Sequence, residues 1–120
     1  MDKKRILIAD DDAISRELVT TALQNAGYEV AGAANGREAL ALFASYQPHL
    51  VLTDLQMPHL DGAGLLSHIK HIAPDTPVIL FTAHSDLGAE REAQRLGADD
   101  YLNKPLDLDE MLGRIAQAVS

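Results

Sequence analysis

Five short apolar runs recur along the chain, and each has the length of one β-strand: RILIA, EVAGA, HLVLT, PVILF and DYLNK. The runs at residues 6–9, 50–53 and 78–81 are continuous rather than alternating, which is typical of strands buried on both faces of a parallel sheet. Apolar residues recur at helical spacing between them. Strict alternation of strands and helices predicts a parallel sheet with helices on both faces, because right-handed crossovers pack in this way. The length of 120 residues suits one such α/β domain, which we place at residues 1–120.

The expected helices carry start and stop signals. Gly27 follows the first helical stripe and suits the left-handed conformation that closes a helix. Asn35 precedes the second helix, and Glu38 three residues later completes a capping pair. The fourth helix, over residues 86–96, is mostly charged, so we expect it to pack lightly and to shift at modest cost. We interpret Asp12, Asp61, Asp86 and Asp107 as helix caps, and the apolar positions expected to face the core include Ile14, Leu18, Val19, Leu23, Leu65, Leu66, Ile69, Ile72, Met111 and Ile115.

Composition excludes several classes of function. The net charge of −8 argues against direct binding of nucleic acid or an anionic membrane, and it favours a cation or a basic partner. Because the chain has no Cys, it forms no disulfide, thiolate nucleophile or Cys-based zinc site, and we expect a reducing cytoplasm. The opening MDKKRILIADDD has too short an apolar run for a signal peptide or a membrane span. Gly62, Gly64 and Ser67 imitate part of a dinucleotide-binding motif but follow a Pro-containing loop, so we reject that site.

Polar side chains stand at the carboxyl ends of four expected strands. Asp10 and Asp11 end the first run and Asp54 ends the third, while Thr82 ends the fourth and Lys104 follows the fifth. In an open α/β sheet this edge holds the ligand site, in the crevice where the strand order reverses. The second run ends in small residues and is expected at the outer edge. The resulting strand order 2-1-3-4-5 places the Asp10 and Asp11 pair next to Asp54.

The residue types at this edge indicate phosphoryl chemistry. Carboxylates gathered in one place repel each other unless a cation is present, and hard oxygen ligands select Mg²⁺ or Mn²⁺. Mg²⁺ takes only one or two carboxylates, so one stays free to react. Lys104 adds a positive charge and Thr82 a hydroxyl, which together suit the oxygens of a phosphoryl group during in-line attack. The alternative that Lys104 forms a surface ion pair and Thr82 merely ends a strand stays open.

These residues resemble the receiver domain of two-component response regulators over essentially the whole chain. The segment ILIADDD resembles the family's acidic cluster, DLQMPHLDG its phosphoacceptor segment, FTA its hydroxyl-bearing strand end and YLNKP its lysine and proline element. The resemblance implies a flavodoxin-like doubly wound sheet with five helices. It also implies Asp54 as the phosphoacceptor and Asp11 as a direct Mg²⁺ ligand. Asp10 is implied to bind the ion through a water molecule or to lie just outside the direct ligands, and Gln56 to bind it through the backbone carbonyl.

The same resemblance implies a switch and a docking surface. Thr82 and Lys104 contact the phosphoryl group, Tyr101 changes rotamer with phosphorylation, and the bond between Lys104 and Pro105 is cis. Gln56 and His84, each two residues beyond a site residue, flank the path of an attacking water and tune the lifetime of the phosphoryl group. Partner docking is implied for Ile14, Ser15, Leu18 and Pro105, although Ile14 and Leu18 also suit the helix core.

The predicted function is therefore a phospho-aspartate signalling switch rather than an enzyme with turnover. Asp54 accepts a phosphoryl group from a histidine kinase or a histidine phosphotransfer protein and slowly dephosphorylates itself. The fourth helix, fifth strand and fifth helix then present the state to an output domain or protein, in a monomer or a phosphorylation-dependent dimer.

Two other classes of function stay open. Asp10 and Asp12 form the Asp-x-Asp of haloacid-dehalogenase-type phosphatases, but Ile14 stands where that family needs Thr or Val, and the chain is short for such an enzyme. The other class is an interaction domain that keeps the fold and works without phosphorylation. Acid-stable turnover of a small phosphomonoester favours the phosphatase, whereas no acyl phosphate with any donor favours the interaction domain.

Overall fold

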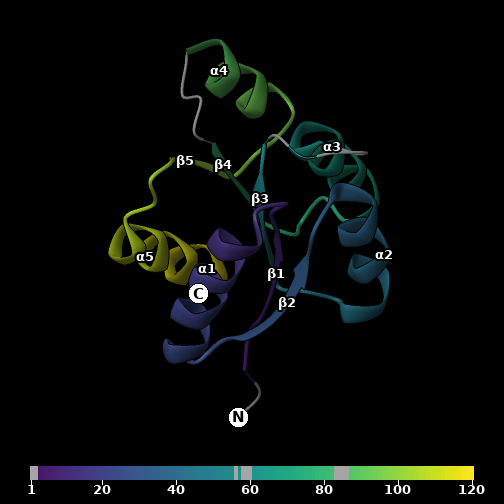
Figure 1. Ribbon diagram of the computed structural model, residues 1–120. Coiled ribbons are helices and arrows are strands. Elements are labelled where there is room, and N and C mark those ends of the chain that lie inside the picture. The colour runs from purple at the N-terminus through teal and green to yellow at the C-terminus, as the bar shows by residue number, and fades with distance from the viewer. Residues whose placement is uncertain (1–2, 56, 58–60, 83–86) are drawn as a thin grey trace.

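The computed structural model describes residues 3–55, 57, 61–82 and 87–120. Strands and helices alternate throughout this part of the chain (Figure 1). The strands are β1 (Arg5–Ala9), β2 (Glu29–Ala33), β3 (Leu50–Asp54), β4 (Val78–Thr82) and β5 (Asp100–Asn103). The helices are α1 (Ala13–Asn25), α2 (Gly36–Tyr46), α3 (Gly62–Ile72), α4 (Leu87–Arg95) and α5 (Leu108–Val119). Within the same residues, no helix has both the length and the apolar character needed to cross a bilayer.

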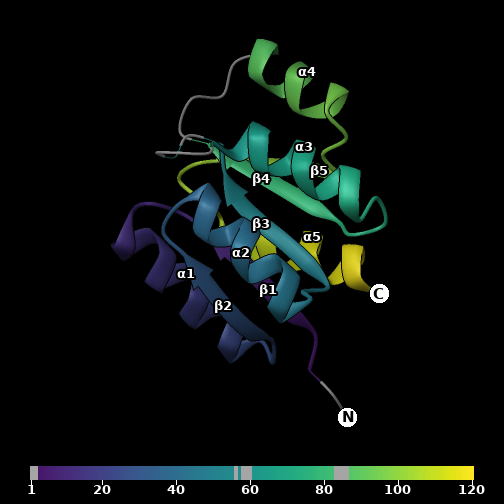
Figure 2. The ribbon, with the colours of Figure 1, turned by 90° about the vertical axis from the view of Figure 1, so that its right-hand side faces the viewer.

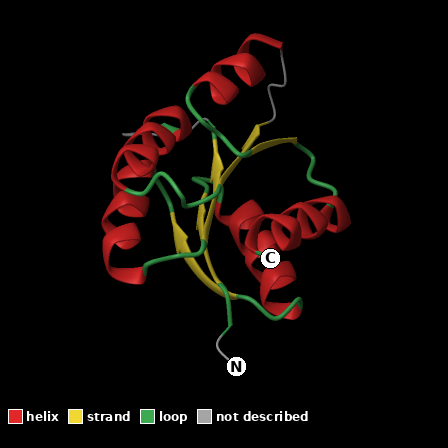
Figure 3. Cartoon of the chain, turned by 180° about the vertical axis from the view of Figure 1, so that it is seen from behind, coloured by secondary structure: helices red, strands yellow, loops and turns green. Residues whose placement is uncertain are grey.

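The strands form one parallel sheet in the order β2-β1-β3-β4-β5, which confirms the predicted topology. Helices α1 and α5 cover one face of the sheet, and α2 and α3 cover the other, while α4 stands beside β5 and packs on this second core through Ala93 (Figures 2 and 3). Each face has its own apolar core. Ile6, Ile8 and Phe81 pack towards α1 and α5, whereas Leu7 and Leu80 pack towards the other three helices.

The apolar runs explain why β1, β3 and β4 occupy the centre of the sheet. All residues of β3 and β4 are buried, whereas β2 lies at an edge and is partly exposed. Both β3 and β4 extend one residue beyond the apolar run, so that Asp54 and Thr82 are their last residues. The polar side chains therefore leave the ends of rigid, fully paired strands.

The predicted caps and the light packing of α4 are present. Asp12 accepts hydrogen bonds from the amides of Ile14 and Ser15 at the start of α1, and Asn35, Asp61 and Asp107 cap α2, α3 and α5 in the same way. Gly27 has φ +98° just after α1, which is the left-handed conformation expected of the residue that closes this helix. On α4, Ala93 is the buried position among the side chains that the structure describes. The expected cap Asp86 lies outside the described residues.

Three isoleucine and leucine side chains predicted to face the core are exposed instead. Ile14 is 81% exposed, Leu18 57% and Ile72 60%. The core prediction is therefore wrong for Ile72, and of the two alternatives left open for Ile14 and Leu18 the core position is wrong. Ile14 is in the first turn of α1 and Ile72 is the last residue of α3, where each helix reaches its end. Leu18 lies one turn after Ile14 and lines a surface groove. Helical spacing identifies a common side of the helix but not whether another element covers it.

Candidate functional site

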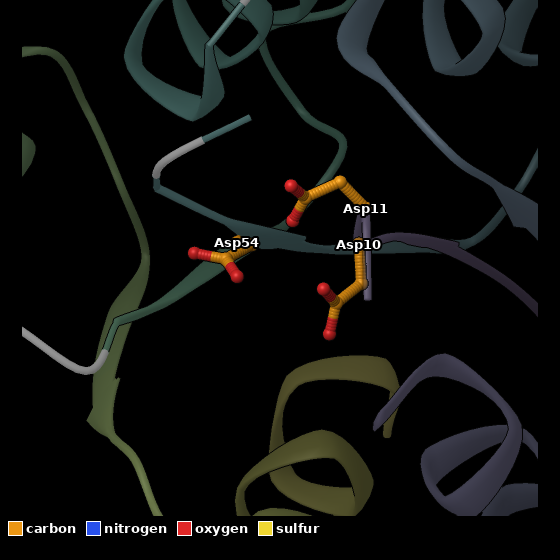
Figure 4. A group of neighbouring side chains, drawn as sticks. All are labelled: Asp10, Asp11 and Asp54. Atoms are coloured by element: carbon orange, nitrogen blue, oxygen red, sulfur yellow. The ribbon is translucent and has the colours of Figure 1, made fainter. Parts of the chain in front are cut away.

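Three carboxylates converge at the carboxyl edge of the sheet. Asp10 and Asp11 follow β1, and Asp54 ends β3, which pairs directly with β1. One oxygen from each carboxylate lies within 4.8 Å of the others, and Figure 4 shows the side chains reaching into a shared space. Asp10 is fully buried, Asp54 is 8% exposed and Asp11 is exposed. The predicted adjacency of these residues is therefore present in the structure.

Lys104, which follows β5, places its ammonium group among these carboxylates. Its Nζ lies 3.0 Å from Oδ2 of Asp54 and 3.5 Å from Oδ2 of Asp10. The same Nζ lies 5.0 Å from the centre of the Phe81 ring. Burial acts to lower the pKa of Lys104, but hydrogen bonding and charge from Asp54 and Asp10 outweigh it and raise the pKa. Lys104 therefore stays positively charged next to Asp54.

Thr82 and Tyr101 lie on neighbouring strands and on the same face of the sheet. Thr82 ends β4 and is 1% exposed, and its carbonyl accepts a hydrogen bond of 2.8 Å from the Lys104 amide. Tyr101 on β5 pairs with Leu80, two residues before Thr82, and packs partly buried against the core under α2, α3 and α4. The bond between Lys104 and Pro105 is cis, as the resemblance implies.

Comparison with known proteins decides the family. A family model described as "Response regulator receiver domain" matches residues 6–116. The chain belongs to the response regulator receiver domains. This receiver domain is 42% identical over its full length to "DNA-binding transcriptional regulator NtrC" of Salmonella typhimurium, of which it covers 26%. It is 43% identical over 96% of its length to "Probable transcriptional regulator ycf27" of Porphyridium aerugineum, of which it covers 48%.

Solved structures agree with this family. The receiver domain superposes with a TM-score of 0.94 on a CheY-like response regulator receiver domain protein from Methanospirillum hungatei, at 31% identity. That match covers 98% of this chain and 94% of the other. This chain spans 26% of the NtrC relative and 48% of the ycf27 relative. Those two proteins are therefore about two to four times as long as this chain.

Two predicted site residues lie outside the described residues, and the predicted cap Asp12 stays apart from the three carboxylates. Gln56 and His84 lie outside the described residues. Asp12 is exposed, and its carboxylate caps α1 instead of joining the three carboxylates. The Asp-x-Asp arrangement of a phosphatase is therefore not supported in this receiver domain.

The residues implied for partner docking lie together beside the site. Ile14, Ser15, Leu18 and Pro105 line one groove of about 240 Å³ between α1 and the segment after β5. Leu106 and Leu108 add apolar surface, and Lys104 lies at the same groove.

Sequence reasoning missed Gly62, the first residue of α3. A Cβ at this position would lie 2.2 Å from the backbone oxygen of Asp54 and 2.7 Å from Cα of Leu55. The Gly62 amide also donates a 2.9 Å hydrogen bond to the carbonyl of Leu55. Because glycine is unfavourable within a helix, its presence directly after the Asp61 cap was the available signal of a close backbone approach.

Proposed function

We propose that this receiver domain accepts a phosphoryl group on Asp54 from a phosphohistidine of a histidine kinase or a phosphotransfer protein. The observation that carries the proposal is the convergence of three carboxylates and one lysine on a single sheet edge. Such a site stabilises a transferring phosphoryl group through its charged oxygens. In this reaction an Asp54 oxygen forms the new bond to phosphorus, while the bond to the donor nitrogen breaks and its electron pair stays on the imidazole.

Burial and hydrogen bonding favour Asp54 over Asp10 as the nucleophile. Asp10 is fully buried, and its Oδ1 already accepts a hydrogen bond of 3.0 Å from the Asp12 amide. Asp54 keeps a small exposed fraction and lies at the end of its strand, so an incoming phosphoryl group can reach it. Lys104 donates a hydrogen bond to the same carboxylate, which supports a role for its ammonium group in holding a phosphoryl oxygen.

The donor set fits a hard divalent cation. Three carboxylates face the single ammonium of Lys104 in this partly buried cluster, so that ammonium offsets their negative charge only in part. Asp10, Asp11, Asp54 and the backbone carbonyl of Gln56 are the residues that would hold Mg²⁺ or Mn²⁺. When bound, the cation neutralises charge on the phosphoryl oxygens.

The intact mass after incubation with Mg²⁺ and a small acyl phosphate tests the proposal. One added phosphoryl group that is labile to base supports it, and an unchanged mass contradicts it. Turnover of a phosphomonoester would assign the phosphatase class instead, while an unlabelled chain that still binds partners would assign the interaction domain.

The output end of the proposed switch is the face made by α4, β5 and α5. A groove on this face is lined by Glu90, Tyr101, Asn103, Glu110 and Arg114, among others. Movement of Thr82 towards a phosphoryl group would free space for Tyr101, and lightly packed α4 would follow. We propose that this face contacts an output domain or protein and, in the phosphorylated state, a second copy.

Docking gives a prediction with a matched control. Ile14→Glu should greatly slow transfer from a phosphohistidine donor, because it places a charge in the apolar groove beside Lys104. Labelling by the small acyl phosphate should be spared. Ile72→Glu changes an isoleucine that is also exposed but lies at the end of α3, so both donors should work normally. Equal loss with both donors for Ile14→Glu, at intact fold, contradicts the docking role.

The lifetime of the phosphoryl group on Asp54 is expected to depend on Gln56 and His84. Gln56→Ala and His84→Ala should each change the decay rate of the acyl phosphate severalfold while leaving stoichiometric labelling intact. The reason is the family resemblance: each residue stands two places beyond a site residue, at a position where the resemblance implies a side chain that borders the approach of water to Asp54. Because histidine titrates near neutral pH, decay in the wild type between about pH 6 and pH 8 should depend on pH more than decay in His84→Ala. Superimposable decay curves for all three proteins would refute the role.

A further inference from the structure

Arg16 on α1 contacts the backbone from which the site carboxylates emerge. Its Nη1 donates a hydrogen bond of 2.6 Å to the carbonyl oxygen of Asp10, and the contact is partly buried. Because the donor is a guanidinium cation, this is a charge-assisted bond to a single backbone oxygen. The bonded carbonyl belongs to the peptide group that joins Asp10 to Asp11.

Gly32 on the edge strand β2 lies against the aliphatic part of Arg16. A Cβ at Gly32 of β2 would lie 3.4 Å from Cδ of Arg16, 3.7 Å from Cγ and 3.8 Å from Nε. The aliphatic part of the arginine therefore lies across the bare backbone of Gly32, which directs the guanidinium to the end of β1. A branched side chain in place of Gly32 would extend beyond Cβ into the arginine.

The backbone amide and the side chain of Asp10 also form hydrogen bonds within the fold. The Asp10 amide donates to the carbonyl of Ala33 at 3.0 Å, and Oδ1 of Asp10 accepts from the Asp12 amide at 3.0 Å. Arg16 holds the remaining backbone group of Asp10, its carbonyl oxygen. Asp11 comes directly after this carbonyl, and its side chain is exposed, so the direction of its carboxylate depends on the orientation of that peptide.

We propose that Arg16, seated on Gly32, is a positioning residue that orients the peptide between Asp10 and Asp11 and thereby sets the affinity of the site for a divalent cation. The inference rests on the proposed function, in which these two carboxylates hold the cation. Partners that orient metal ligands from outside typically change metal affinity by about ten- to a hundredfold when they are removed. Arg16 therefore acts on cation binding, and Asp54 remains the group that reacts.

The test measures Mn²⁺ binding directly, from the electron paramagnetic resonance signal of the free ion, with Mg²⁺ as competitor. Arg16→Ala should raise the Kd for Mn²⁺ about tenfold or more. Labelling by a small acyl phosphate at saturating Mg²⁺ should stay close to the wild-type rate. General damage to the fold would lower both the Mn²⁺ affinity and the labelling rate. In the cation-free protein, the amide resonance of Asp11 should shift because its peptide has lost a hydrogen bond.

Companion variants separate positioning from charge and from folding. Arg16→Lys should recover part of the affinity, since an ammonium can donate to the same carbonyl but lacks the planar fork. Gly32→Val keeps every charge and suits a strand, yet it should weaken Mn²⁺ binding by displacing Arg16. The double variant should bind no worse than Arg16→Ala alone, because both changes remove the same contact. Arg37→Ala, which removes an exposed arginine from the first turn of α2, is the charge control and should bind nearly as wild type.

The outcomes distinguish this inference from the proposed function. A wild-type chain that binds no Mn²⁺ and gains no phosphoryl group overturns both. A wild-type chain that binds Mn²⁺, with unchanged affinity in Arg16→Ala and Gly32→Val, overturns the positioning role alone. Equal weakening in Arg16→Ala and Arg37→Ala also overturns it, because general charge would then be the cause. Should Arg16→Ala fail to fold, Gly32→Val decides by the same comparison.

Discussion

Gly62→Ala is expected to destabilise the receiver domain by about 3 kcal/mol or more, well above the usual effect of adding a methyl group. The added Cβ would meet the backbone oxygen of Asp54 at 2.2 Å, and a backbone at the end of a central strand cannot turn aside as a flexible side chain can. Either α3 moves off the sheet or the end of β3 shifts. In both cases labelling of Asp54 should slow even under conditions where the chain stays folded.

Gly113→Ala supplies the matched control for this variant. Gly113 is inside α5, and a Cβ there meets nothing within 4 Å among the described residues. The same substitution should therefore stabilise the domain by about 0.5–1 kcal/mol, because alanine loses less backbone entropy than glycine in a helix. Urea unfolding of the two variants and the wild type measures both effects. A Gly62→Ala variant as stable as Gly113→Ala would show that α3 does not seat against Asp54 as described.

The fold was predictable because the central strands are buried on both faces. A continuous apolar run such as residues 78–81 has few alternatives to a central strand of a parallel sheet, and the structure bears this out. The convergence of Asp10, Asp11 and Asp54 followed from the same topology, since parallel strands end at a common edge. Each of these inferences needs only the order of elements along the chain.

What could not be predicted depends on how closely two elements approach. Leu18 and Ile72 have helical spacing that suits a core, yet no element in the described part of the chain fully covers them. In the sequence Gly62 matches only part of a dinucleotide-binding motif, and nothing there shows how close it lies to the Asp54 backbone. Arg16 is a charged residue on α1, and neither its contact with the Asp10 carbonyl nor the packing of its side chain against Gly32 of another strand can be read from its place in the sequence.

Metal dependence follows from the same acidic cluster. Asp11→Ala should lose Mg²⁺ affinity and labelling together, because it removes the most exposed of the three carboxylates that face the shared space. A chelator should have the same effect on the wild-type chain. Labelling that survives in the presence of chelator would contradict the role of the cation.

We expect Asp54 alone to receive the phosphoryl group. The most direct measurement is the intact mass of three chains after incubation with Mg²⁺ and a small acyl phosphate: the wild type, Asp54→Asn and Asp75→Asn. Asp75→Asn removes the same charge from an exposed loop before β4 and serves as the matched control. We expect one added phosphoryl group on the wild type and on Asp75→Asn, and none on Asp54→Asn. An equal mass gain in Asp54→Asn would place the nucleophile elsewhere and contradict the account.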